Sequence, residues 1–65
     1  MIADLKVPKK YQESFDYLET DFDLIDDCKY MLWLKEGWTC DGEGRNFPVR
    51  SKAEALRFIK DAWKM

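Results

Sequence analysis

The sequence predicts an α+β domain in which a three-stranded antiparallel meander carries two packed helices, in the order α-β-β-β-α. Apolar residues recur at helical spacing near both ends of the chain, whereas turns that contain glycine divide the middle into short segments. The 65 residues form one small domain, with 1–7 as an extended or frayed lead-in. Aromatic residues make up 15% of the chain, which indicates that aromatic packing stabilises this small core.

The first predicted helix spans residues 8–20. Pro8 suits its first turn, where the missing N–H has no intrahelical acceptor. A narrow apolar stripe recurs at steps of four, three and four residues: Tyr11, Phe15, Leu18 and Phe22. Tyr17 lies off this stripe, so we expect it to be more exposed.

A strand is predicted over residues 29–35, after an aspartate-rich connector at 21–27. Gly37 follows too soon for this segment to be a helix. It favours a type I turn with a G1 bulge, because a type I′ turn would force Glu36 to positive φ.

In the resulting hairpin, strand 29–35 pairs with residues 38–41. One face of the hairpin is then uniformly apolar: Tyr30, Leu32, Leu34, Trp38 and Cys40. Met31 and Trp33 lie on the second face. The alternative register divides the aromatic residues between both faces, so the bulged register is preferred, with Trp38 buried and Trp33 more accessible.

The last third of the sequence predicts an edge strand and a helix. Pro48 restricts strand 45–49 to an edge, because proline cannot donate to a ladder. Ser51 and Glu54 form a capping box that starts a helix over residues 52–64. The apolar arc of this helix is broad: Ala55, Leu56, Phe58, Ile59, Ala62 and Trp63.

The residue types present argue against catalysis. Histidine is absent, which removes the commonest general base and most zinc sites. Cys40 is the one conceivable nucleophile, and we expect it to be buried and inert. Two cysteines and no signal peptide predict a cytoplasmic protein with reduced thiols, since Cys28 and Cys40 lie too far apart in the hairpin to be bridged. We therefore expect a protein that is not an enzyme, with no cofactor and no metal site.

Two features of strand 29–35 are candidates for partner binding. Met31 and Trp33 combine a thioether and an aromatic ring, a pairing that suits an interface anchor. The alternative is that the first helix covers them. The free edge of the same strand could pair with a second copy to give a homodimer. In the alternative reading, Lys29 and Lys35, or the lead-in at 1–7, protect that edge.

The connector supplies a concentrated acidic segment. Four aspartates lie among apolar residues: Asp21, Asp23, Asp26 and Asp27. They could dock on a basic protein that handles nucleic acid, or they could be a solvated acidic face. A calcium loop is disfavoured, because its sixth and twelfth positions would be Asp26 and Leu32 rather than glycine and glutamate.

Basic residues of the second half are the candidates for nucleic-acid binding: Arg50, Arg57, Lys60 and Lys64. Nucleic-acid-binding domains usually have a strongly basic balance, whereas the pI of this protein is about 5.0. Direct nucleic-acid binding is therefore the least favoured alternative, and we expect these side chains to be solvated.

Small size, acidity, aromatic density and the lack of catalytic groups together resemble the short orphan proteins of phages and mobile elements. These include anti-CRISPR and other anti-defence inhibitors. The resemblance concerns overall character and includes no motif. It implies steric or electrostatic blocking of a basic, nucleic-acid-handling host protein. A self-associating structural module is the alternative function.

Overall fold

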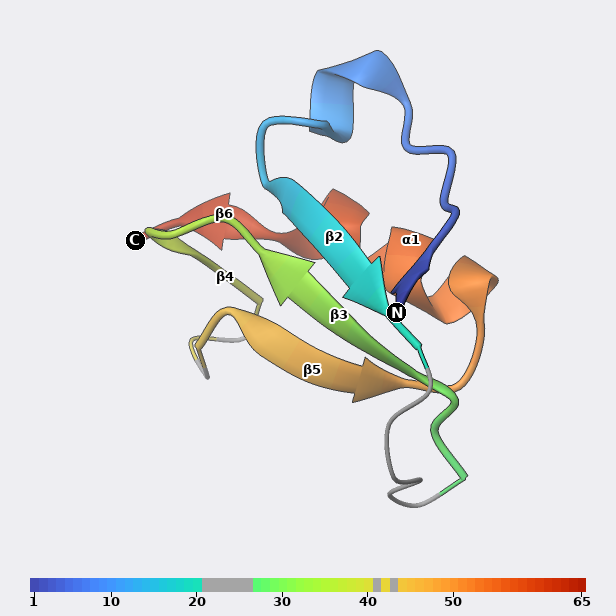
Figure 1. Ribbon diagram of the computed structural model, residues 1–65. Helices are drawn as coiled ribbons and strands as arrows, with labels where there is room; N and C mark the ends of the chain where they lie inside the picture. Colours follow the sequence, from blue (N-terminus) through green and yellow to red (C-terminus); the bar gives the residue numbers. More distant parts are fainter. Residues whose placement is uncertain (21–26, 41, 43) are drawn as a thin grey trace.

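The computed structural model describes residues 1–20, 27–40, 42 and 44–65 (Figure 1). Within these residues the protein forms one α-helix, one 3-10 turn and six strands. In sequence order the elements are β1 (Ile2–Ala3), η1 (Lys9–Tyr11), β2 (Phe15–Glu19), β3 (Tyr30–Leu34), β4 (Trp38–Thr39), β5 (Asn46–Val49), α1 (Lys52–Asp61) and β6 (Trp63–Lys64). The α+β class is therefore confirmed, but the expected α-β-β-β-α arrangement with two helices is wrong.

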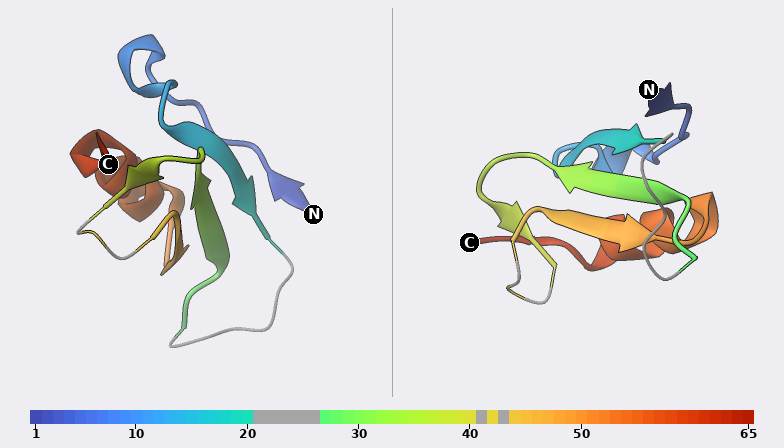
Figure 2. Two further views of the ribbon diagram at one scale, coloured as in Figure 1. Left: turned by 90° about the vertical axis from the view of Figure 1, so that its left-hand side faces the viewer. Right: turned by 60° about the horizontal axis from the view of Figure 1, so that its bottom comes forward.

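Four of the strands form an antiparallel sheet in the order β1-β2-β3-β5, and β4 pairs with β6 in a separate two-stranded sheet. In Figure 1, α1 lies behind the larger sheet, and the left-hand view of Figure 2 shows it to one side of β2 and β3. The larger sheet therefore has one face covered by α1 and one face turned away from it.

The core lies between α1 and the covered face of the sheet. Its buried residues are Val7, Leu18, Leu32, Leu34, Val49, Ala55 and Ile59. Along β3, Leu32 and Leu34 are fully buried, whereas Met31 and Trp33 are half-buried. Because successive side chains of a strand point to opposite faces, this pattern confirms the predicted division of β3 into a core face and a second face.

The helix expected over residues 8–20 is wrong. Pro8 begins only the short turn η1, and the backbone then enters β2. A β-bulge interrupts β2 between Phe15 and Tyr17, where two residues of β2 advance against one residue of β3. The bulge shifts the alternation of side chains by one position. Phe15 and Leu18 therefore both meet the core although they are three residues apart, a spacing that imitates a helix.

The hairpin expected between residues 29–35 and 38–41 is also wrong. The turn itself is present, since the amide of Trp38 donates to the carbonyl of Lys35 at 3.0 Å and Gly37 has φ of +89°. After it, however, β4 leaves β3 and pairs with β6. Trp38 is accordingly half-buried rather than buried, although it packs against the core and Trp33 does not.

β3 instead pairs with β2 on one side and β5 on the other. This arrangement satisfies the backbone donors and acceptors on both sides of the strand. The free edge at residues 29–35, which a homodimer through this strand requires, is therefore absent.

β5 is an edge strand, as Pro48 predicted. The amide of Leu34 donates to the carbonyl of Arg45 at 2.7 Å, which fixes the alternation of hydrogen-bonded pairs between β3 and β5. In that alternation the nitrogen of Pro48 points away from β3. A donor is thus missing from the outer edge of the sheet, which hinders the addition of another strand.

The start of α1 follows the sequence prediction. The hydroxyl of Ser51 accepts a hydrogen bond from the amide of Glu54 at 3.1 Å, and the Glu54 carboxylate accepts one from the amide of Arg50 at 3.3 Å. The helix ends earlier than expected, at Asp61. Ala62 is extended, and the pairing of β6 with β4 replaces the last predicted turn.

We expect Ser51→Ala to lower the free energy of unfolding by about 0.5–2 kcal/mol, because the amide of Glu54 loses its acceptor. Chemical denaturation measures this difference. Ser51→Asp is the matched control, since it keeps an acceptor at the same position and should remain near the wild-type stability. Equal stability of the alanine variant and the wild type would contradict the capping role.

Candidate functional site

The face of the sheet turned away from α1 carries a cluster that we call the aromatic face: Tyr17, Glu19, Met31, Trp33 and Arg45. Antiparallel partners on neighbouring strands share a face. Tyr17 is opposite Trp33, and Glu19 is opposite Met31. Leu18 and Leu32, which alternate with these residues, are buried in the core, so the aromatic face is on the other side of the sheet, which is turned away from α1. The sequence therefore placed Met31 and Trp33 on a common face correctly.

Trp33 is the centre of the aromatic face. Its ring stacks on Tyr17 with 5.7 Å between ring centroids and an interplanar angle of 12°. The Arg45 guanidinium carbon lies 5.5 Å from the ring centroid, and the indole N–H donates to the carboxylate of Glu19 in a long hydrogen bond of 3.4 Å. Since β3 is an inner strand, these neighbours reach Trp33 from both sides. They restrain its ring while leaving part of it exposed.

Met31 extends the aromatic face along β3. It lies opposite Glu19 on one side and Pro48 on the other, and Ile2 of β1 is the next partner of Glu19. Ile2 is 70% exposed, and Met31 is half-buried. The row that crosses the sheet through Met31 is therefore largely apolar and reaches both edge strands.

Of the four predicted acidic contacts, Asp27 is described, and Asp21, Asp23 and Asp26 lie outside the described residues. Asp27 is exposed and has φ of 63°, a left-handed conformation that aspartate tolerates better than most residues. Thr20 and Asp27, which flank the undescribed residues, follow β2 and precede β3. The backbone thus enters and leaves the acidic segment at the end of the sheet nearest Met31.

Reactive groups are scarce among the described residues. Cys28 and Cys40 are buried, being 6% and 3% exposed, and no disulfide joins them. This confirms the predicted burial of Cys40. Where the structure describes the protein, no group of three or more cysteine or acidic residues is placed to hold a metal ion. The aromatic face itself offers contact area, one cation and one carboxylate, which suit binding.

The basic residues considered for nucleic acid do not form one row. Arg50, Arg57 and Lys60 are exposed on or beside α1, but Lys64 has left the helix and lies in β6. Lys60 is instead near Tyr11, with 6.0 Å from its ammonium nitrogen to the ring centroid. No continuous basic surface follows from this set.

Sequence reasoning misses Tyr17, Glu19 and Arg45. Tyr17 and Glu19 are missed because they lie within residues 8–20, which the sequence predicts to be a helix. Arg45 is missed because it is only one of several basic residues in the second half of the sequence. Tyr17 and Glu19 lie on either side of the buried Leu18, as alternating residues of a strand do, and aromatic residues are enriched in strands. That alternation is the available signal for β2.

Comparison with known proteins assigns no family. No known protein family, curated protein or solved structure matches this sequence or its fold. Among the residues that the structure describes, no helix is long and apolar enough to cross a membrane. The function must therefore be inferred from the geometry of the protein itself.

We expect the Tyr17–Trp33 pair to stabilise the fold by about 0.5–1.5 kcal/mol beyond its buried area. A double-mutant cycle with Tyr17→Leu and Trp33→Leu, followed by chemical denaturation, measures this coupling. The control cycle combines Tyr17→Leu with Trp63→Leu, since Trp63 lies in the other sheet. A coupling no larger than in the control cycle would show that the stacked rings do not interact energetically.

Proposed function

We propose that this protein is a non-catalytic protein-binding module and that the aromatic face is its contact surface. The observation that carries the proposal is the partly exposed Trp33 on an inner strand, in contact with Tyr17 and Arg45. Tryptophan, tyrosine and arginine are the residues most enriched at the energetic centres of interfaces. Restraint before binding also reduces the entropy lost when a side chain is immobilised against a partner.

A protein partner fits this surface better than a nucleic acid. Exposed aromatic residues on a sheet can stack on bases, but nucleic-acid binding also needs cations along the backbone. The protein has a net charge of −2, and Glu19 lies beside Trp33. The acidic segment would add repulsion of the nucleic-acid phosphates at the end of the aromatic face nearest Met31. These charges favour a protein surface with an apolar centre and basic residues around it.

The partner in this proposal is a basic protein, and the mode of action is obstruction. The aromatic face supplies the contact that slows dissociation, and the acidic residues attract the basic surface. The resemblance to anti-defence inhibitors of phages and mobile elements gives this idea a specific form. In that form the protein covers the nucleic-acid-binding surface of a basic host protein. Self-association through the edge of β3 is not retained, because that edge is already paired.

We expect Trp33→Ala and Met31→Ala to accelerate dissociation from the partner with little change in the association rate. A photo-crosslinking residue at position 31 identifies the partner, and surface-immobilised binding then measures both rates. The crosslink must be competed by unlabelled protein. Trp63→Ala is the matched control, because Trp63 is 50% exposed and lies in the other sheet.

Three outcomes distinguish the possibilities. Faster dissociation for the Trp33 and Met31 variants alone supports the proposal. If only Trp63→Ala accelerates dissociation, the contact lies at β4 and β6 and the proposal is wrong. If position 31 crosslinks to a second copy and mass rises with concentration, the aromatic face is a homodimer interface.

The acidic residues should act mainly on association. Reversal of Asp23, Asp26 and Asp27 to lysine should slow association and reduce its dependence on salt, because steering by exposed charges is screened over about 10 Å at 0.1 M salt. The control carries the same change in net charge at three other exposed acids: Glu13, Glu36 and Asp61. Equal effects of the two triple variants would attribute the attraction to net charge rather than to the acidic segment.

A further inference from the structure

A groove of about 400 Å³ lies between the N-terminal segment and the start of β2. Its lining residues are Leu5, Val7, Gln12, Phe15, Asp16 and Lys35. It shares no residue with the aromatic face. Small-molecule sites in proteins usually have volumes of about 300–1,000 Å³, so the groove is of a size to hold a small metabolite.

Local structure fixes both walls of the groove. The side-chain amide of Gln12 donates to the carbonyl of Val7 at 3.0 Å, which ties η1 to the N-terminal segment. The amide of Lys35 donates to the carbonyl of Ser14 at 2.8 Å, which ties the end of β3 to the start of β2. These two bonds restrain the segments that carry the lining residues Val7, Gln12 and Lys35.

The β-bulge in β2 lies at the groove. Asp16 is the residue between the two shifted pairs, Phe15 with Leu34 and Tyr17 with Trp33. A bulge redirects a side chain relative to the regular alternation of a strand, and bulges are frequent beside functional sites. Here the bulge places a carboxylate at the groove while Phe15 keeps its contact with the core.

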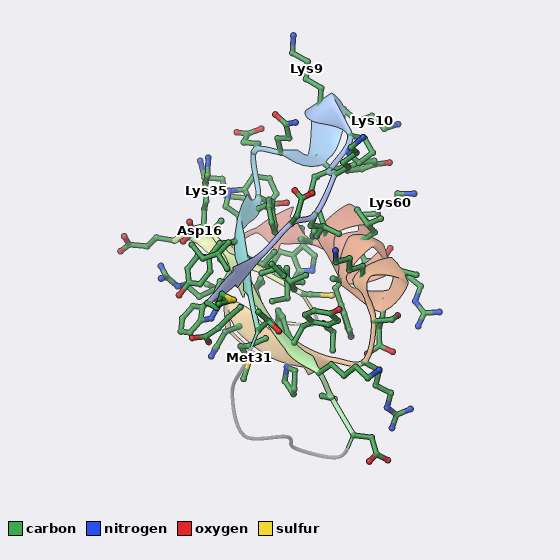
Figure 3. The ribbon with its side chains drawn as sticks, turned by 45° about the vertical axis from the view of Figure 1, so that its right-hand side comes forward. Lys9, Lys10, Asp16, Met31, Lys35 and Lys60 are labelled. Atoms are coloured by element: carbon green, nitrogen blue, oxygen red, sulfur yellow. The ribbon has the colours of Figure 1, made fainter. Side chains whose placement is uncertain are left out.

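Two opposite charges stand at this groove without neutralising each other. Figure 3 shows Asp16 and Lys35 on the same side of β2, and both line the groove. Among the described residues, neither side chain takes part in a hydrogen bond or ion pair. Three apolar residues also line the groove: Leu5, Val7 and Phe15.

We propose that this groove binds an α-amino acid with an apolar side chain. The ammonium group of the ligand meets Asp16, its carboxylate meets Lys35, and its side chain contacts the apolar lining residues Leu5, Val7 and Phe15. A simple anion would be repelled by Asp16, and a simple cation by Lys35. A zwitterion satisfies both residues, and contact with the apolar lining residues distinguishes leucine-like ligands from glycine or serine.

The test is a titration of the full-length protein with L-leucine, followed by the backbone amide signals of Gln12, Asp16 and Lys35 in two-dimensional NMR. Leucinamide lacks the carboxylate, N-acetyl-leucine lacks the ammonium group, and glycine lacks the side chain. We expect each of the three to bind about three- to tenfold more weakly than L-leucine. The two leucine derivatives also represent the N-terminal and C-terminal ends of a peptide, so the series separates a free amino acid from a peptide end.

Variants assign each charge to its partner group. Asp16→Asn should weaken L-leucine and leucinamide but not N-acetyl-leucine, whose binding should improve slightly because a repelling carboxylate is removed. Lys35→Gln should weaken L-leucine and N-acetyl-leucine but not leucinamide, whose binding should improve slightly because a repelling ammonium group is removed. Asp61→Asn and Lys52→Gln are the matched controls, since both residues are exposed and neither lines the groove. Denaturation curves check that every variant is folded.

Two results would overturn the proposal. One is the absence of saturable shifts at the groove with L-leucine, and the other is an equal response to glycine and L-leucine. Tighter binding of a leucine derivative than of L-leucine would assign the groove to a peptide end and would equally reject a free amino acid. Trp33→Ala should not alter the titration with L-leucine. A failure of the amino-acid site is therefore distinguishable from a failure of the proposed partner contact at the aromatic face.

Discussion

The alternation of side chains along β3 is the constraint on which the rest of the structure depends. Leu32 and Leu34 are fully buried against α1, and Met31 and Trp33 are thereby held on the opposite face. A shift of one residue would exchange the two sets and place the tryptophan in the core. The same register of β3 therefore determines both the core and the aromatic face.

That register is held from both sides. Leu32 lies opposite Leu18 of β2 and Phe47 of β5, so a slip on either side would break a contact in the core. Phe47 in turn stacks on Phe58 of α1, with 5.6 Å between ring centroids. A domain of this size has little buried surface to lose. The rigidity of Trp33 therefore derives from packing on the far side of the sheet as well as from Tyr17 and Arg45.

The features that sequence predicted are those governed by neighbours along the backbone. The cap of α1 depends on Ser51 and Glu54, three residues apart, and the faces of β3 depend on alternation within five residues. The features that it missed depend on distant partners. Whether β3 pairs with residues 38–41 or with β2 and β5 is decided by burial of the whole core, which the turn at Gly37 does not encode.

β2 illustrates a different limit. The bulge at Asp16 gives Phe15 and Leu18 a spacing that fits a helix as well as a strand, and Pro8 at a suitable distance strengthens the wrong choice. Met31 and Trp33 are found from sequence because they lie on the element whose periodicity is unambiguous. Tyr17, Glu19 and Arg45 can be joined to them only once the order of the strands is known.

The proline in β5 has a consequence for how the protein would behave as its concentration rises. One edge of the sheet lacks a donor at Pro48, and the opposite edge, β1, is only two residues long. Growth of the sheet from one molecule to the next is disfavoured at both edges. A dimer that uses neither edge of this sheet can form face to face, over the surface proposed for the partner. Dimer formation and partner binding would then compete for the aromatic face. The amount of partner bound would therefore level off at high protein concentration instead of rising in proportion to it.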